Sequence, residues 1–321
     1  MSAGRPTLGE RGEMDFHTEY TQLPSLNRIY RELILTRRKG LKKGETLPAL
    51  SASLKDIRVD PEKVRAYRTV CGLPEGSDLP LLYPHVLVAN LQMSLVSHAA
   101  FPLKGFGMVH SRQHALRRRQ IDAREMLSAL CRIGESRPVK AGLEFDIVTV
   151  VSSGHEPVYE GISTYLARGK FGEPVELSGY AIIPTLTNEN AGLAKEWRLP
   201  SNIGRQYAKV SGDYNPIHIS SILAKLFGYR KAIVHGMWSA ARALAELPPL
   251  PDDQGLRADL AFKGPIFVGS RVAMKVEASE SAYGFEAYCG SNPRPCVVGK
   301  VQAVPQAALL AQMTENVCAP N

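Results

Sequence analysis

Hydrophobic and polar residues alternate with period two along much of the last quarter of the chain. The runs are rich in β-branched and aromatic residues and predict strands at 256–262, 271–278, 283–289 and 296–304. Gly, Pro, Ser and Asn between them predict turns. Upstream, an Ala- and Leu-rich stretch predicts a helix over 236–247, which two prolines end. A shorter helix is predicted over 220–228, between a serine cap and Gly228.

The first half of the chain has the same order of elements. An apolar stretch predicts a helix over 86–99, and strands are predicted at 124–133, 143–151 and 158–166. Helices followed by runs of strands indicate an α+β fold with antiparallel sheets. Residues 1–25 are expected to form a poorly ordered arm, and 26–43 a basic amphipathic segment. Gly, Pro, Thr and Asn concentrate over 170–196 and predict a linker.

A six-residue pattern, Y-x-x-V-[C/S]-G, occurs at 67–72 and again at 207–212. Each copy follows a proline-led helix start, and a Pro-His element comes after it, around His85 in one copy and His218 in the other. Agreement on both sides of the pattern indicates an internal duplication. The chain is therefore divided into an N-terminal arm with a basic segment, a first unit and a second unit, at 1–45, 46–175 and 176–321.

Composition limits the class of protein. The chain has 321 residues, of which 44% are apolar and 22% charged, as in ordinary globular proteins. No run approaches the ~20 apolar residues that a membrane helix needs, and no hydrophobic signal segment begins the chain, so a cytoplasmic location is expected. Five scattered cysteines without a C-x-x-C pair indicate reduced thiols rather than a zinc knuckle or a disulfide framework.

The formal charge of +8 fits an anionic ligand, a nucleic acid or a membrane surface. Basic residues gather in two places, Arg37, Arg38, Lys39, Lys42 and Lys43, and Arg117, Arg118 and Arg119. Neither cluster is interleaved with the aromatic residues on which nucleic-acid bases stack. Solvated basic faces are the expected interpretation of both, and no nucleic-acid partner is expected.

The densest group of polar residues lies between Ser211 and His218. Gly212 and the Asn215-Pro216 pair favour an irregular turn, on which Asp213 and His218 could converge and hold a water between them. Such a pair could accept and donate protons. The residues alone leave a second interpretation open, in which Asp213 only shapes the turn and His218 only flanks a helix.

Gly236 stands at the start of the Ala-rich helix, in the run Val234-His235-Gly236-Met237. N–H groups on the first turn of a helix lack internal partners, so they can face a partial negative charge such as a thioester oxygen. Glycine lets a ligand approach the backbone closely. The alternative is a glycine at a tight junction between a strand and a helix.

These motifs resemble those of the R-specific enoyl-CoA hydratases, the MaoC-like dehydratases. The match consists of Tyr207-x-x-Val210-Ser211-Gly212-Asp213-x-Asn215-Pro216-Ile217-His218-x₅-Ala224, then Val234-His235-Gly236-Met237, then Phe262-Lys263-Gly264-Pro265-Ile266-Phe267-Val268-Gly269. The resemblance implies a double hot-dog fold, two antiparallel sheets that each wrap a helix. It also implies that Asp213 and His218 are catalytic, that Asn215 supports substrate binding, and that the Gly236 amide holds the thioester carbonyl.

The first copy departs from this pattern. Leu73 follows Gly72 where Asp213 follows Gly212, and no G-D-x-N-P-x-H occurs before residue 200. The first unit is therefore expected to be a degenerate, catalytically silent hot-dog. His85, which lacks an acidic partner in the motif, is expected to be structural.

Other motifs are incomplete. His110 and His114 have the spacing of a zinc helix but lack its glutamate, and Gly105 and Gly107 lack the third glycine of a dinucleotide loop. No nucleophile elbow and no Walker loop occurs. No metal, nicotinamide or ATP is expected, so the only cofactor-like group is the CoA or carrier-protein part of the substrate.

The resemblance implies a hydro-lyase that reversibly hydrates trans-2-enoyl thioesters to (R)-3-hydroxyacyl thioesters. Two alternatives stay open, a 3-hydroxyacyl-carrier-protein dehydratase of fatty-acid synthesis and a non-catalytic subunit that scaffolds a partner or binds acyl-CoA. An acyl-CoA or acyl-carrier protein is the expected partner, and a homodimer is possible. The sequence does not decide between Asp213 and His218 as the base toward water.

Overall fold

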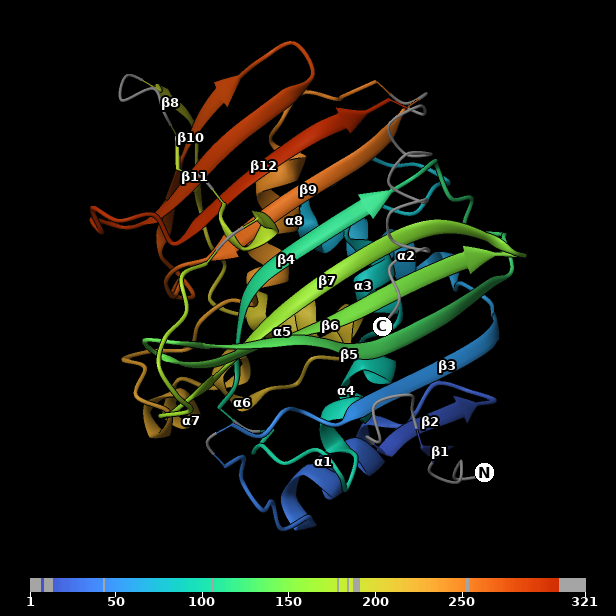
Figure 1. The fold of residues 1–321 in the computed structure, drawn as a ribbon. Coiled ribbons are helices and arrows are strands. Elements are labelled where there is room, and N and C mark those ends of the chain that lie inside the picture. Colours follow the sequence, from blue (N-terminus) through green and yellow to red (C-terminus); the bar gives the residue numbers. More distant parts are fainter. Residues whose placement is uncertain are drawn as a thin grey trace.

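All strands of the computed structural model belong to one sheet (Figure 1). The structure describes residues 7–8, 14–42, 44–105, 107–177, 179–183, 185–186, 191–251 and 254–305. The strands of the first half are β1 (Thr7–Leu8), β2 (Met14–Tyr20), β3 (Ala49–Ile57), β4 (Val109–Arg117), β5 (Leu127–Val139), β6 (Gly142–Ser153) and β7 (Glu156–Arg168). Those of the second half are β8 (Leu193–Arg198), β9 (Gly255–Phe262), β10 (Arg271–Ala278), β11 (Ala282–Cys289) and β12 (Val297–Val304).

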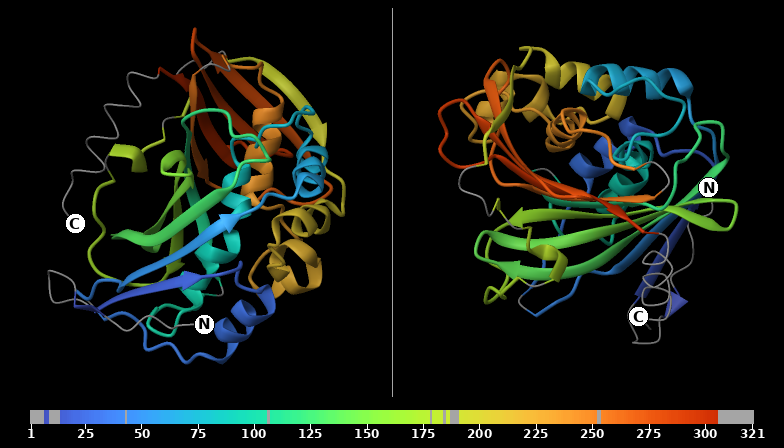
Figure 2. Two further views of the ribbon diagram at one scale, coloured as in Figure 1. Left: turned by 90° about the vertical axis from the view of Figure 1, so that its right-hand side faces the viewer. Right: turned by 90° about the horizontal axis from the view of Figure 1, so that it is seen from above.

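The α-helices gather on one face of this curved sheet (Figure 2). They are α1 (Leu26–Leu35), α2 (Pro61–Cys71), α3 (Tyr83–Leu87), α4 (Ala89–Ser97), α5 (Ile203–Ser211), α6 (Pro216–Ile219), α7 (Ser221–Leu226) and α8 (Gly236–Ala245). A single 3₁₀ turn, η1 (Gly179–Ala181), lies between the halves of the sequence. A continuous apolar core from both halves fills the space between helices and sheet, and includes Phe145, Tyr159 and Phe285.

The strand order shows the duplication directly. The sheet runs β1-β2-β3-β5-β6-β7-β4-β9-β12-β11-β10-β8, so the strands on either side of the β4–β9 pair follow the same order outward. β4 and β9 are antiparallel and pair from Arg112 opposite Ala261 to Arg117 opposite Leu256. Each half packs its sheet around a helix, α4 in the first and α8 in the second. The predicted α+β double hot-dog is confirmed, while the exact unit boundaries stay predictions.

The repeated six-residue pattern forms the last turn of α2 and of α5. Gly72 and Gly212 end these helices with φ of 70° and 74°, a left-handed conformation that glycine adopts without a steric penalty. The tyrosines of the pattern, Tyr67 and Tyr207, are both buried, and their ring centroids lie 6.1 Å apart. The pattern therefore brings the two halves together at their helices.

Several predicted elements need correction. Residues 14–20, placed in a poorly ordered arm, form β2, which pairs in parallel with β3. The helix over 86–99 is two helices, α3 and α4, which meet at Val88. β3 was not predicted because Ala and Ser at alternate positions weaken its hydrophobic pattern, and β8 lies in the predicted linker. Four cysteines are buried and unpaired, whereas Cys318 lies outside the described residues.

The second basic cluster is not a solvated face. Arg117 pairs with Asp78, Arg118 with Glu160, and Arg119 with Glu125 and Glu156. In the first cluster, Arg38 donates to the carbonyl oxygens of Ser97, the last residue of α4, and of Phe101 in the loop that follows. Lys43 lies outside the described residues. Within the described ranges, no helix combines the length and the apolar character needed to cross a bilayer.

Candidate active site

A short loop between α5 and α6 carries the predicted acid. Gly212 ends α5, and Asp213 follows it with its side chain half exposed. Oδ1 of Asp213 accepts a hydrogen bond from the Asn215 N–H at 3.0 Å, and the Asn215 side chain caps α6 by accepting from the Ile217 N–H at 3.4 Å. These two turns fix the carboxylate, so that Oδ2 faces the neighbouring histidines.

His218, on α6, presents a ring nitrogen to Asp213. Nδ1 lies 2.9 Å from the Ile233 carbonyl oxygen, which can only accept, so Nδ1 carries the proton. Nε2 therefore has a free lone pair, and it lies 4.0 Å from Oδ2 of Asp213. A water that makes ~2.8 Å hydrogen bonds to both atoms fits this separation. The predicted pair is thus brought together.

His235 is a third member of the site. It precedes α8, and its ring is stacked on that of His218 with centroids 3.8 Å apart. Its Nε2 donates to the Asp213 carbonyl oxygen at 2.9 Å and lies 3.7 Å from Oδ2. Its neighbour Gly236 was predicted as a site residue, whereas His235 was not. An imidazole inside the motif Val234-His235-Gly236-Met237 could have marked His235 as a candidate.

The three groups set one another's charge. Burial acts to raise the pKa of Asp213, but His235, His218 and the Asn215 N–H together hold it below its usual value. Burial lowers the pKa of His218, although the Asp213 charge opposes this. Burial and the nearby His218 lower the pKa of His235 to about 3. At neutral pH the site therefore holds an ionised carboxylate and two neutral imidazoles.

Gly236 is the first residue of α8 and directly follows His235. A Cβ at this position would lie 3.0 Å from the ring of Phe262, so any other residue would require this ring to shift slightly. The first helical bond of α8 runs from the Ser239 N–H to the His235 carbonyl. Among the described residues, no acceptor faces the Gly236 N–H. Its position agrees with the predicted role in binding, and the role itself stays a prediction.

Residues from the first half of the chain also lie close to the site. Tyr30 of α1 bonds the backbone of Tyr214, and the Asp213 charge adds to burial in raising its pKa to about 12. His110 of β4 is stacked on Tyr165, with centroids 4.8 Å apart, and also contacts Phe262. The surroundings of Asp213 are therefore built from both halves of the chain.

His85 is stacked on His110, with ring centroids 5.5 Å apart, and forms no ion pair with a carboxylate among the described residues, although the charge of Asp213 acts to raise its pKa. It is buried, and its Nδ1 lies 3.3 Å from the hydroxyl oxygen of Ser163. This environment agrees with the structural role predicted for the histidine of the first copy. Leu73, which replaces the aspartate in that copy, packs against the core instead.

Buried histidines make the fold sensitive to acid. Burial lowers the pKa of His85 to about 4 and those of His110 and His235 to about 3, from an ordinary 6.5. The unfolded chain therefore binds more protons than the folded chain below pH 6.5. The free energy of unfolding has its full value above pH 6.5 and decreases as the pH falls. Between pH 6.5 and 5 we expect each histidine to cost ~2 kcal/mol of unfolding free energy.

Thermal unfolding of the protein between pH 7.5 and 5 measures this loss. The Tm is expected to fall steeply, and His110→Gln, which keeps a polar side chain without a titrating ring, is expected to flatten the profile. A Tm that is constant over this range would show that the buried histidines do not control acid stability.

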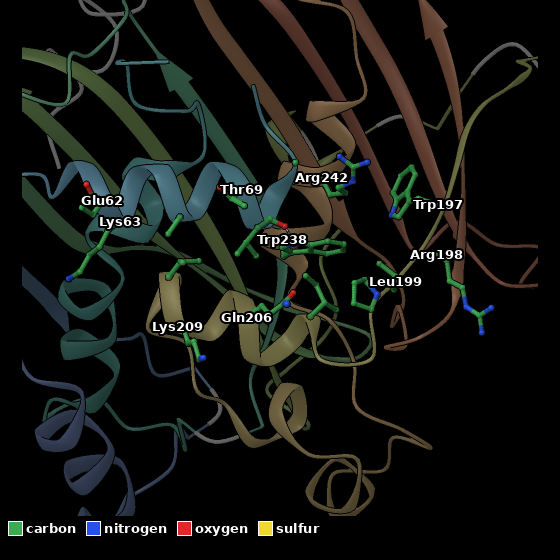
Figure 3. A pocket seen from close by; sticks show the side chains of 16 residues that line it. Glu62, Lys63, Thr69, Trp197, Arg198, Leu199, Gln206, Lys209, Trp238 and Arg242 are labelled. Atoms are coloured by element: carbon green, nitrogen blue, oxygen red, sulfur yellow. Dashed lines mark hydrogen bonds between the residues drawn. The ribbon is translucent and has the colours of Figure 1, made fainter. Parts of the chain in front are cut away.

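A large groove lies away from these residues. It has a volume of about 830 Å³ and follows the seam between α2 and α5, with Trp197, Trp238 and Arg242 at one end (Figure 3). None of the predicted site residues lines it. A smaller cavity of about 240 Å³ adjoins His218 and is lined by Arg205, Ser220 and Ile222, among others. This cavity connects His218 to the surface beside α6 and α7.

Asp213, His218 and His235 also have the donor atoms of a metal site, all within 4.8 Å of one another. His235, however, uses the proton on Nε2 to bond the Asp213 carbonyl oxygen, so this nitrogen has no lone pair to offer. The hydrogen bonds fit a proton-transfer site better than a metal site.

Comparisons with known proteins point to one family. Residues 188–293 match the model of the MaoC like domain. The 3-hydroxyacyl-thioester dehydratase X of Mycobacterium tuberculosis is 31% identical over 241 residues, which are 74% of this chain and 84% of that protein. The (R)-specific enoyl-CoA hydratase of Aeromonas caviae is 34% identical over 76 residues, 23% of this chain and 57% of that protein. The crystal structure of HtdX of Mycobacterium tuberculosis superposes with a TM-score of 0.69 and 28% identity, covering 79% of this chain and 100% of its own.

Proposed function

Because the chain belongs to the family of MaoC-like dehydratases, we propose that it is a hydro-lyase that reversibly hydrates 2-enoyl thioesters to 3-hydroxyacyl thioesters. The observation that carries this proposal is the pairing of an ionised Asp213 with the lone pair of His218 at 4.0 Å. The (R) configuration of the product rests on the resemblance to the (R)-specific hydratase.

The reacting water would bind between Oδ2 of Asp213 and Nε2 of His218. As its oxygen adds to C3, a proton passes to this pair, and C2 takes up a proton. Since Asp213 is ionised and Nε2 of His218 is unprotonated, the pair carries no spare proton at the start. The proton that reaches C2 therefore derives from the water, and Asp213 and His218 act as one relay.

The enolate-like state places negative charge on the thioester oxygen. The proposed donor to that oxygen is the N–H of Gly236, on the first turn of α8, where the dipole of the helix adds to the effect. Asn215 acts through the turn that orients Asp213. No step requires a metal, a nicotinamide or ATP.

Hydration of crotonyl-CoA, followed by loss of the absorbance of its conjugated enoyl thioester, tests the proposal. We expect turnover by the purified full chain without added metal or nucleotide. Absence of turnover with both a CoA thioester and a carrier-protein thioester would support the alternative of a non-catalytic subunit.

The same assay gives the pH dependence. Because the pKa of His218 lies below its usual value, we expect the rate to be constant through pH 6.5 and to fall only at lower pH, as His218 becomes protonated. An acid limb centred above pH 6.5 would contradict the neutral, buried state of His218.

A further inference from the structure

From the surface around α7 we infer that the thioester reaches this site on an acidic carrier protein, which docks on α7. This inference rests on the proposed function and names the partner of the same site. The docking face is defined here by α7 with Phe227 and by the basic residues Arg205, Lys225, Arg230 and Lys231.

Helix α7 exposes apolar side chains that no described residue covers. Ile222 and Leu226 are each 78% exposed, and Leu223 and Phe227 are about two-fifths exposed. Only Ala224 of this helix is buried. Large apolar side chains clustered on one short helix mark an interaction surface rather than random surface composition.

The docking face is also strongly cationic. Between residues 199 and 231, Asp213 is the only carboxylate. None of the four cations of the docking face forms an ion pair with a described residue, in contrast to Arg117, Arg118 and Arg119. Arg230 instead lies over the ring of Phe267, 4.3 Å from its centroid. The docking face therefore carries four positive charges without a paired carboxylate.

The docking face borders the reacting groups. Ile222 and Arg205 line the small cavity beside His218, and α6, which carries His218, packs against α7. Tyr214, next to Asp213, is 47% exposed on the same loop. A protein bound on α7 would thus hold its thioester arm at the opening of the site.

Three other occupants fit less well. CoA is small and anionic, which accounts for the cations but not for the aliphatic side chains of Leu226 and Ile222 facing solvent. A second copy of the chain would bring two cationic faces together, which costs energy. A lipid surface would cover the opening without delivering a thioester. An acidic protein with apolar contact residues matches both charge and apolar surface.

Kinetics on two substrates test the inference. The kcat/KM of the full chain is measured with crotonyl-CoA and with the crotonyl thioester of an acidic acyl carrier protein. Leu226→Ser changes no charge, and Leu226 lies outside the catalytic machinery. This substitution is expected to lower kcat/KM for the carrier thioester by about tenfold, as loss of a central interface contact does, and to leave the value for crotonyl-CoA unchanged. Lys225→Glu is expected to raise KM more for the carrier thioester than for CoA.

Matched controls come from β5, where Leu130 and Arg132 are both exposed on the sheet. Leu130→Ser and Arg132→Glu are expected to alter neither substrate's kinetics. Equal losses on both substrates in Leu226→Ser, or turnover of crotonyl-CoA without turnover of the carrier thioester, would overturn the docking inference and leave the proposed function intact. Turnover of neither would instead reject the proposed function. Carrier kinetics unaffected by Leu226→Ser, with lost binding to anionic phospholipid vesicles, would assign the face to lipid.

Discussion

Replacing Asp213 by Asn, or His218 by Gln, is expected to lower kcat by ~10²–10⁴-fold, the usual contribution of a general acid or base. Asparagine can still accept a hydrogen bond from the Asn215 N–H, and glutamine can still bond the Ile233 carbonyl, so the loop keeps its shape. The loss is therefore expected in kcat with little change in Tm. Because both residues act in one relay, the double variant should be hardly slower than either single variant.

The internal repeat provides the control for this experiment. His85→Gln changes the histidine of the first copy, which forms no ion pair with a carboxylate among the described residues and lies 3.3 Å from the Ser163 hydroxyl oxygen. Its kcat is expected to stay within a few-fold of the unchanged protein. Near-normal activity in a folded Asp213→Asn or His218→Gln protein would show that the pair is misassigned.

Gly236→Pro is expected to lower kcat by ~10²–10³-fold, the usual effect of losing one donor to a developing oxyanion. Proline removes the N–H, and it is tolerated at the first position of a helix. His235 has φ of −64° and ψ of 136°, an extended conformation that suits a residue before proline. The substitution therefore removes the donor and keeps the helix.

Steric effects are separated by Gly236→Ala, which retains the N–H but adds the same Cβ against Phe262. The alanine variant measures the cost of crowding the ring, and the further loss in the proline variant measures the donor. Equal kcat values for the two variants would remove Gly236 from the proposed stabilisation of the thioester oxygen.

Much of the second half could be predicted from the sequence because its hydrophobic pattern, its turn residues and its prolines all indicate the same helices and strands. The period-two runs gave β9 to β12 within one residue at each end, and the prolines after α8 marked where that helix stops. That Asp213 and His218 lie together could be predicted because they stand on one short turn. The catalytic and binding roles of Asp213, His218 and Gly236 came from the family resemblance and stay predictions.

Other features depend on distant parts of the chain. His235 becomes a site residue only when its ring is stacked on His218, which requires Ile233 to approach α6. The contribution of Tyr30 depends on α1 packing against the catalytic loop. The prediction of a solvated face was wrong for Arg117 and Arg118, because their partners, Asp78 and Glu160, lie far from them in sequence.

The β4–β9 pair has a consequence for how this protein can change. Six consecutive residues of each strand join the halves into one sheet, and the apolar core is continuous across the join. Separating the halves would leave two long unpaired edge strands, which favour aggregation. Truncation of the chain to its second half is therefore expected to yield an aggregating protein, because β9 would lose its partner strand and the core would lose one side. The first half is thus needed for its edge strand and its core whether or not it takes part in the reaction.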